Sequence, residues 1–152
     1  MGGEYMIYLT DNYDLLKWTG VTEENLGMEN MAIDELKLLL SIEKQEFISL
    51  IAEPNIARII ENKLNMKVEV NKCIKAFLSP NDMIIYVNYV QGEITLTKIE
   101  LETQWTVDFY SKEKKLIKKI ELGNMKYSQA VKEACIHGLG INYDLYDLYY
   151  VV

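Results

Sequence analysis

The fold is decided by residues 47–90, which read FISLIAEPNIARIIENKLNMKVEVNKCIKAFLSPNDMIIYVNYV. A helix is predicted to begin at Pro54, because a first helical residue loses nothing by lacking an N–H. Apolar residues at helical spacing carry this helix to Asn65, a residue type that favours a helix C-cap. The continuous apolar run 83–90 predicts a central buried strand. The other elements predicted in this stretch are a strand over 47–51, a strand with one solvated face over 68–78 and a turn over 79–82.

The regions on either side of this stretch add further regular elements. The predicted strands lie at 6–10, 105–110 and 143–152, and the predicted helices at 33–42 and 127–137. Residues 94–99 fit a strand or a short helix, and periodicity alone does not decide between them. We therefore expect an α/β protein with a small mixed β-sheet flanked by helices. A cluster of lysines over 112–119 follows a change in composition near residue 111.

Charge excludes several classes of partner. The 152 residues include 16 basic and 23 acidic side chains, which gives a net charge of -7. Duplex DNA is therefore not an expected partner, because nonspecific binding needs a basic surface. Arg58 is the only arginine, so bidentate recognition of phosphate is nearly lost. The lysine cluster is interpreted as a solvated face, although it could also contact an anion or an acidic partner.

The sequence predicts neither a metal site nor a membrane segment. Two isolated cysteines, Cys73 and Cys135, and one histidine, His137, are too few and too widely spaced for a zinc site. No apolar run reaches the roughly 18 residues that a membrane helix needs. The N-terminal residues lack the pattern of a secretory signal. We expect a soluble, intracellular protein without a cofactor.

Several motifs of residues 47–90 occur in the order that a known family shows. A strand ending at Glu53 is followed by a helix, then by Asn71-Lys72, then by Pro80-Asn81-Asp82 and a buried strand. This order resembles the small viral ring nucleases, which are type III anti-CRISPR proteins of archaeal viruses, phages and plasmids. Their pattern is a strand ending in Ile-Gly-His, a helix, an Asn-Arg step, a Pro-Gly-Asp turn and a buried strand. The resemblance covers residues 6–113 approximately and includes an N-terminal strand that ends near Asp11. It implies a ring-nuclease-like α/β domain over 1–113, with a C-terminal helix-plus-strand extension, 114–152, packed on the same domain.

The resemblance implies a compact α/β homodimer that binds cyclic tetra-adenylate, a host defence messenger, in a pocket across the dimer. The family opens the ring without a metal: a ribose 2′-hydroxyl attacks the adjacent phosphate while a histidine assists as general acid. For this chain the resemblance implies a viral or mobile-element protein in the cytoplasm of the host cell. The candidate ligand-binding residues are Asp11, Asn12, Asn55, Ile56, Arg58, Asn71, Lys72, Gln91 and Glu93.

The departures from the family pattern predict that catalysis is weak or lost. Glu53 stands where the family has its histidine, Lys72 replaces an arginine, and residues 90–93 lack the family's Arg-Leu-x-Glu-Gly signature. Carboxyl groups, with ordinary pKa values of about 4.3, are poor general acids at neutral pH, and an ionised one repels phosphate. Loss of the acid removes about 10²–10⁴ in rate. We therefore expect a counter-defence protein that sequesters a cyclic oligonucleotide or a related nucleotide signal, with Glu53 as the one candidate catalytic residue.

Two other functions remain open on the sequence. The acidic composition is compatible with a protein-binding inhibitor that occupies a basic site on a host defence nucleoprotein complex. Alternatively, a residual metal-independent phosphodiesterase could use Glu53 or Glu93 as a base, with Lys72 or Arg58 stabilising the developing charge.

Overall fold

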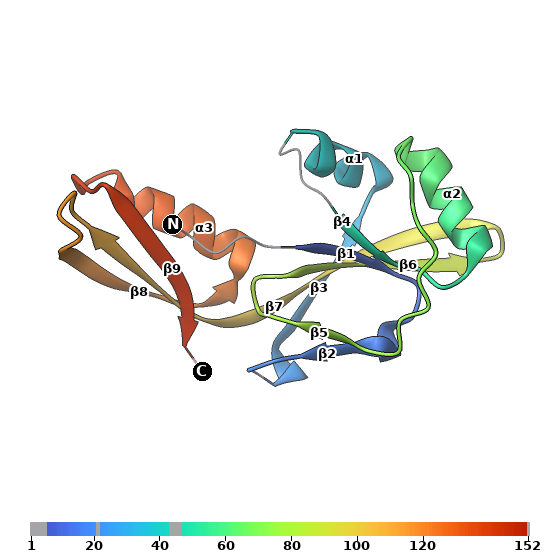
Figure 1. Ribbon diagram of the computed structural model, residues 1–152, viewed down its shortest axis with the longest axis horizontal. Coiled ribbons are helices and arrows are strands. Elements are labelled where there is room, and N and C mark those ends of the chain that lie inside the picture. Colours follow the sequence, from blue (N-terminus) through green and yellow to red (C-terminus); the bar gives the residue numbers. More distant parts are fainter. Residues whose placement is uncertain (1–5, 21, 43–46, 152) are drawn as a thin grey trace.

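A mixed β-sheet organises the chain in the computed structural model, which describes residues 6–20, 22–42 and 47–151 (Figure 1). Its strands are β1 (Ile7–Thr10), β3 (Leu26–Met31), β4 (Phe47–Leu50), β6 (Met83–Val90) and β7 (Glu93–Tyr110). The strand order is β3-β7-β6-β1-β4. β1 runs parallel to both of its neighbours, whereas β7 runs antiparallel to β6 and β3. The expected mixed sheet is therefore confirmed.

The two faces of this sheet bury different cores. Helices α1 (Ile33–Ile42) and α2 (Pro54–Leu64) cover one face, where Leu36 and Ile60 belong to one core with Ile85 of β6. On the other face lies a two-stranded parallel ribbon made of β2 (Leu16–Trp18) and β5 (Ala76–Leu78). There Leu78 packs in one core with Ile84. Because successive residues of a strand point to opposite faces, the neighbours Ile84 and Ile85 serve the two cores separately.

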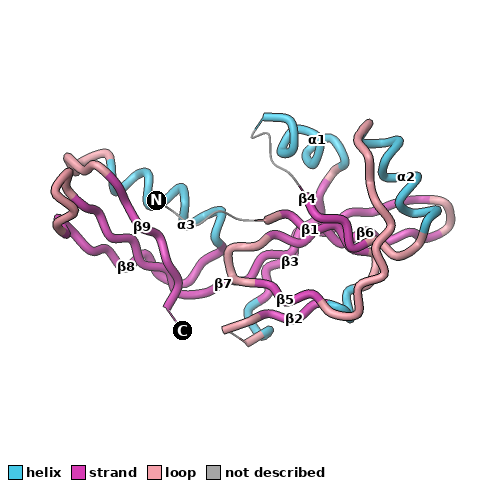
Figure 2. Tube along the Cα trace, in the orientation of Figure 1, coloured by secondary structure: helices cyan, strands magenta, loops and turns pink. Residues whose placement is uncertain are grey.

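The 18-residue strand β7 continues beyond the main sheet and carries a third core. Its second half pairs on one side with β8 (Leu116–Lys126) and on the other with β9 (Leu145–Val151). Helix α3 (Tyr127–Gly138) packs on these strands, and the buried Trp105 and Phe109 of β7 belong to this third core. The strand thus runs from the elements around α1 and α2 to those around α3 (Figure 2). The division of the chain after residue 113 stays a prediction, and the third core draws on β7 residues that precede it.

A tight turn joins β6 to β7. Gln91 and Gly92 both have positive φ, 52° and 83°, as the two central residues of a type I′ turn require. This turn matches the right-handed twist of the flanking strands, so it sets the antiparallel register that pairs Val90 with Glu93.

Most predicted elements are confirmed, and one is largely wrong. Helix α1 has the predicted bounds, and α2 runs from Pro54 to Leu64 with Asn65 as its C-cap in the left-handed conformation. The predicted strand over 68–78 is wrong for most of its length: only Ala76–Leu78 form a strand, and Val70 makes an isolated bridge with Ile51. This segment passes from the helical face to the β2–β5 ribbon on the opposite face, so it cannot stay in one sheet. The elements not predicted are β2, β3, β8 and two short 3₁₀ helices, Tyr13–Leu15 and Glu23–Asn25.

Candidate functional site

The carboxyl ends of the parallel strands β1 and β4 meet at one edge of the main sheet. Asp11 directly follows β1, and its carboxylate accepts the backbone N–H of Ala52 at 3.1 Å and that of Glu53 at 3.0 Å. These two residues connect β4 to α2. The aspartate therefore fixes the end of β1 against the start of α2, and brings two of the predicted site residues together.

Glu53 is the N-cap residue of α2, but its side chain makes no capping hydrogen bond. Its carbonyl accepts the N–H of Ala57 at 3.1 Å, and Pro54 supplies no N–H. The exposed Asn55 and the half-buried Ile56 follow. Among the described residues, no acceptor is found for the amides of Asn55 and Ile56. Backbone donors at a helix N-terminus favour an anion, so these two amides are the free donors at this edge.

The chain after α2 adds Asn71 and Lys72 to the same edge. The N–H of Asn71 donates to the carbonyl of Ile51 at 2.8 Å, and the hydroxyl of Ser49 in β4 donates to the carbonyl of Glu69 at 2.5 Å. Residues 69–71 are therefore held along β4. The side chains of Asn71 and Lys72 are both exposed, and Arg58 is exposed on the first turns of α2.

Three other candidates have different surroundings. Asn12 caps the 3₁₀ helix after β1: its side-chain oxygen accepts the N–H of Asp14 at 3.1 Å. Gln91 lies in the β6–β7 turn and Glu93 begins β7, and both are exposed. The last β6 residue paired with β1 is Tyr86, so the turn lies about 16 Å farther along an extended strand. No hydrogen bond among the described residues joins Gln91 or Glu93 to the edge around Asp11.

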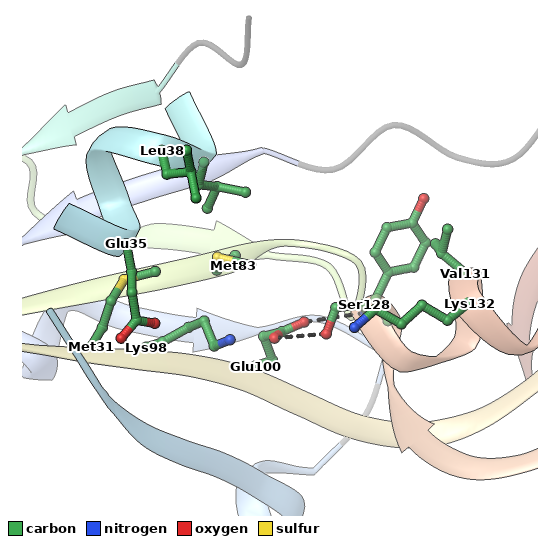
Figure 3. A pocket seen from close by; sticks show the side chains of 11 residues that line it. Met31, Glu35, Leu38, Met83, Lys98, Glu100, Ser128, Val131 and Lys132 are labelled. Carbon is green, nitrogen blue, oxygen red and sulfur yellow. Dashed lines mark hydrogen bonds between the residues drawn. The ribbon is translucent and has the colours of Figure 1, made fainter. Parts of the chain in front are cut away.

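A second arrangement of polar groups was not predicted from the sequence. A cavity of about 560 Å³ opens between α1 and α3 (Figure 3). Lys98 and Glu100 of β7 lie in it together with Ser128 and Lys132 of α3. Glu100 is only 2% exposed; its carboxylate accepts the hydroxyl of Ser128 at 3.0 Å and the backbone N–H of Ser128 at 3.3 Å.

The polar groups of this cavity left little signal in the sequence. Residues 98 and 100 alternate with the apolar Ile99 and Leu101, which is typical of the solvated face of a strand.

The carboxylate of Glu29 on β3 forms an ion pair with Lys126 and lies 3.8 Å from the ammonium of Lys98. The hydrogen bond and charge of Lys126, followed by the charge of Lys98, lower the pKa of Glu29. Burial raises the pKa of the Tyr127 phenol in the cavity wall.

The described residues contain no cluster of three or more His, Cys, Asp or Glu side chains that could hold a metal ion. Within the same residues, no helix combines the length and the apolar character needed to cross a membrane. No protein-family model matches the sequence, and no curated protein matches it either.

Proposed function

We propose that this chain is a counter-defence protein that binds and sequesters a cyclic oligonucleotide messenger, with little or no turnover. The observation that carries the proposal is the pair of hydrogen bonds from Ala52 and Glu53 to Asp11. Together with the bond from Asn71 to Ile51, it gathers segments distant in sequence at the carboxyl edge of β1 and β4. Ligands of open α/β sheets bind outside the carboxyl ends of the strands, which is where this edge lies.

The groups that would hold a phosphate are the free amides of Asn55 and Ile56 and the charges of Arg58 and Lys72. Amides at a helix N-terminus and nearby cations both favour an anion. The carboxylate of Asp11 already uses the amides of residues 52 and 53, so those donors are not open to a ligand. Because Asp11 occupies those two amides, a phosphate of the ligand would bind at the amides of Asn55 and Ile56, at the start of α2.

The weak turnover follows from Glu53. Its side chain is exposed and makes no hydrogen bond within the described part of the chain. Ring opening by a 2′-hydroxyl needs a proton donor for the leaving oxygen, and an exposed glutamate is a poor substitute for histidine in that role. Binding without cleavage keeps the messenger from the host nucleases just as effectively while the protein is in excess.

The test is to incubate the purified protein with a panel of cyclic oligonucleotides and other nucleotide signals, denature it, and analyse what is released. We expect intact messenger in stoichiometric amount. Arg58→Ala and Lys72→Ala should each weaken binding about tenfold, since each removes a charged contact. Lys37→Ala, on the exposed side of α1, is the matched control and should bind unchanged. Release of linear product would identify an enzyme. If all three variants bind the messenger as tightly as the parent protein does, the proposed site is wrong.

The Glu53→His variant tests whether residue 53 lies beside the phosphate that would react. If the edge has the family geometry, histidine supplies the missing proton donor, and slow ring opening should appear. A gain anywhere within the 10²–10⁴ range expected for general acid catalysis would support the assignment. If the variant binds messenger as tightly as the parent protein and still yields no linear product, the reacting phosphate does not lie beside residue 53.

One observation favours a second function, the protein-binding inhibitor. Along the segment after α2, Ile74 is 90% exposed and Phe77 is 68% exposed, and Met66 and Val70 are also exposed. A large exposed apolar side chain such as Ile74 or Phe77 is a candidate contact with another protein where it forms part of a continuous patch. If no nucleotide binds, capture of a defence complex that is lost on Phe77→Ser would identify this function instead.

A further inference from the structure

We infer that the cavity between α1 and α3 is a second binding site, which takes a small amphipathic anion with an aliphatic body and a single carboxylate. This site is separate from the edge around Asp11 and does not depend on the proposed nucleotide binding. Its volume of about 560 Å³ lies within the range of about 300–1,000 Å³ that is typical of small-molecule sites.

The two acidic groups of the cavity are already compensated by helix N-termini. Glu100 accepts the N–H and the hydroxyl of Ser128 in the first turn of α3. Glu35 lies in the first turn of α1, and its carboxylate accepts the N–H of Ala32 at 3.4 Å. A negative charge is stabilised by the N-terminal end of a helix. Neither carboxylate therefore requires a cationic ligand.

The two basic groups are less well compensated. The ammonium groups of Lys98 and Lys126 both face the carboxylate of Glu29. Lys126 is the nearer of the two, and Lys98 lies 3.8 Å from that carboxylate. Lys132 has no ion-pair partner among the described residues. Figure 3 shows both ammonium groups pointing toward the Glu100–Ser128 pair from opposite sides. The cavity lining holds two lysines and two glutamates, so its formal charges balance. Because both glutamates already accept hydrogen bonds, the place left for an anion is between the two ammonium groups, and the nearby carboxylates disfavour an anion of higher charge.

The rest of the cavity suits an aliphatic chain. Leu38 and Leu39 line the cavity from α1 and Val131 lines it from α3, and Met31 and Met83 complete its apolar lining. Leu38 is 58% exposed although it is a large apolar residue. Leucine and valine offer no polar partner, and methionine side chains adapt to irregular aliphatic ligands. An alkyl chain lying on these residues would cover Leu38 and place its carboxylate beside Lys98 and Lys132.

The test measures decanoate binding to the full chain by isothermal titration calorimetry, at concentrations where decanoate is monomeric. We expect saturable binding at one site with a Kd of roughly 0.1 mM, a value consistent with the size of the ligand. Decanol and decylamine, which have the same chain without a negative charge, should bind at least about tenfold more weakly.

Two variants and two matched controls test the location. Leu38→Asp and Lys132→Glu should each weaken decanoate binding about tenfold or more. Lys132→Glu places a carboxylate beside that of the ligand, and Leu38→Asp places a charge against its alkyl chain. Leu139→Asp, at a leucine that is 88% exposed outside the cavity, and Lys112→Glu, at an exposed turn, should bind as the parent protein does. Both wall residues are exposed, so thermal melting should show all four variants folded.

The proposal is overturned by any of three results. The first is the absence of saturable decanoate binding. The second is decanol or decylamine binding as tightly as decanoate, which would remove the role of the lysines. The third is an equal loss of binding in the wall variants and in their controls, which would place the ligand elsewhere.

Discussion

Asp11→Asn is the sharpest test of how the edge of the main sheet is assembled. The aspartate carboxylate accepts two backbone N–H groups, at 3.1 and 3.0 Å. Asparagine has nearly the same shape but only one acceptor oxygen, so it turns an amino group toward one of the two N–H donors. Hydrogen bonds to charged groups contribute about 1.5–3 kcal/mol each when buried. Because this site is partly exposed, we expect the free energy of unfolding to fall by about 1–2 kcal/mol.

Urea denaturation measures this loss directly. A chain of this size unfolds with an m-value of about 2 kcal/mol per molar urea, so the midpoint should fall by about 0.5–1 M with the m-value unchanged. The matched control is Asp14→Asn, since that side chain is exposed and, within the described residues, accepts no hydrogen bond. The control should stay within about 0.5 kcal/mol of the parent. Equal midpoints for Asp11→Asn and the parent would mean that β1 does not hold the start of α2, and the proposed site would lose its framework.

Three further predictions concern stability. The hydrogen bond and charge of Lys126 lower the pKa of Glu29, so this ion pair stabilises the fold above the ordinary pKa of glutamate, and its contribution is lost as the pH falls through the lowered pKa; Glu29→Gln should cost less than about 1 kcal/mol at pH 7, because the side chain is half exposed, and progressively less in more acidic solution. In a double-mutant cycle of Glu100→Ala and Ser128→Ala, thermal unfolding should give a coupling energy of about 1–3 kcal/mol, whereas additive effects would contradict the contact. Asn65→Ala should lower the unfolding free energy by about 1 kcal/mol, since φ is 55° there, whereas Asn65→Gly should be neutral or stabilising.

The elements that sequence predicted well are those whose signals are local. Helix α2 has a proline at its first position, apolar residues at helical spacing and an asparagine that takes the left-handed C-cap conformation. Helix α1 has two acidic residues in its first turn and the predicted bounds. Each of these features depends on residues within a few positions of one another, so tertiary contacts do not change the outcome.

The errors come from contacts that are distant in the sequence. Alternation over 68–78 describes a half-buried extended chain, but it does not say which sheet the chain joins. The structure divides this segment between a bridge to β4 at Val70 and the ribbon strand Ala76–Leu78. The length of β7 was not predicted, for the same reason. Its first half pairs with β3 and β6 and its second half with β8 and β9, so residues 94–99 and 105–110 form one strand only because of these distant partners.

The candidate site was predictable only in part. Sequence order placed Asp11, Glu53 and Asn71 at the ends of successive elements, and hydrogen bonds join these segments. Gln91 and Glu93 were included because they directly follow the buried strand β6. The β6–β7 hairpin extends past the end of β1 before it turns, which takes both residues away from the edge around Asp11. The cavity between α1 and α3 had no sequence signal, because its walls are nearly a hundred residues apart in the chain.

The position of α3 relative to α1 follows from the continuity of β7. A single strand carries Lys98 and Glu100 on the main sheet and, within a few residues, the buried Trp105 of the third core. The hydrogen bonds from Ser128 to Glu100 and the ion pair of Lys126 with Glu29 then tie the start of α3 back to the main sheet. With the strand and both cross-connections in place, the two walls of the cavity are held apart before any ligand arrives. A ligand entering such a preformed site loses less free energy to ordering of the protein, which is why a small carboxylate is a sufficient probe.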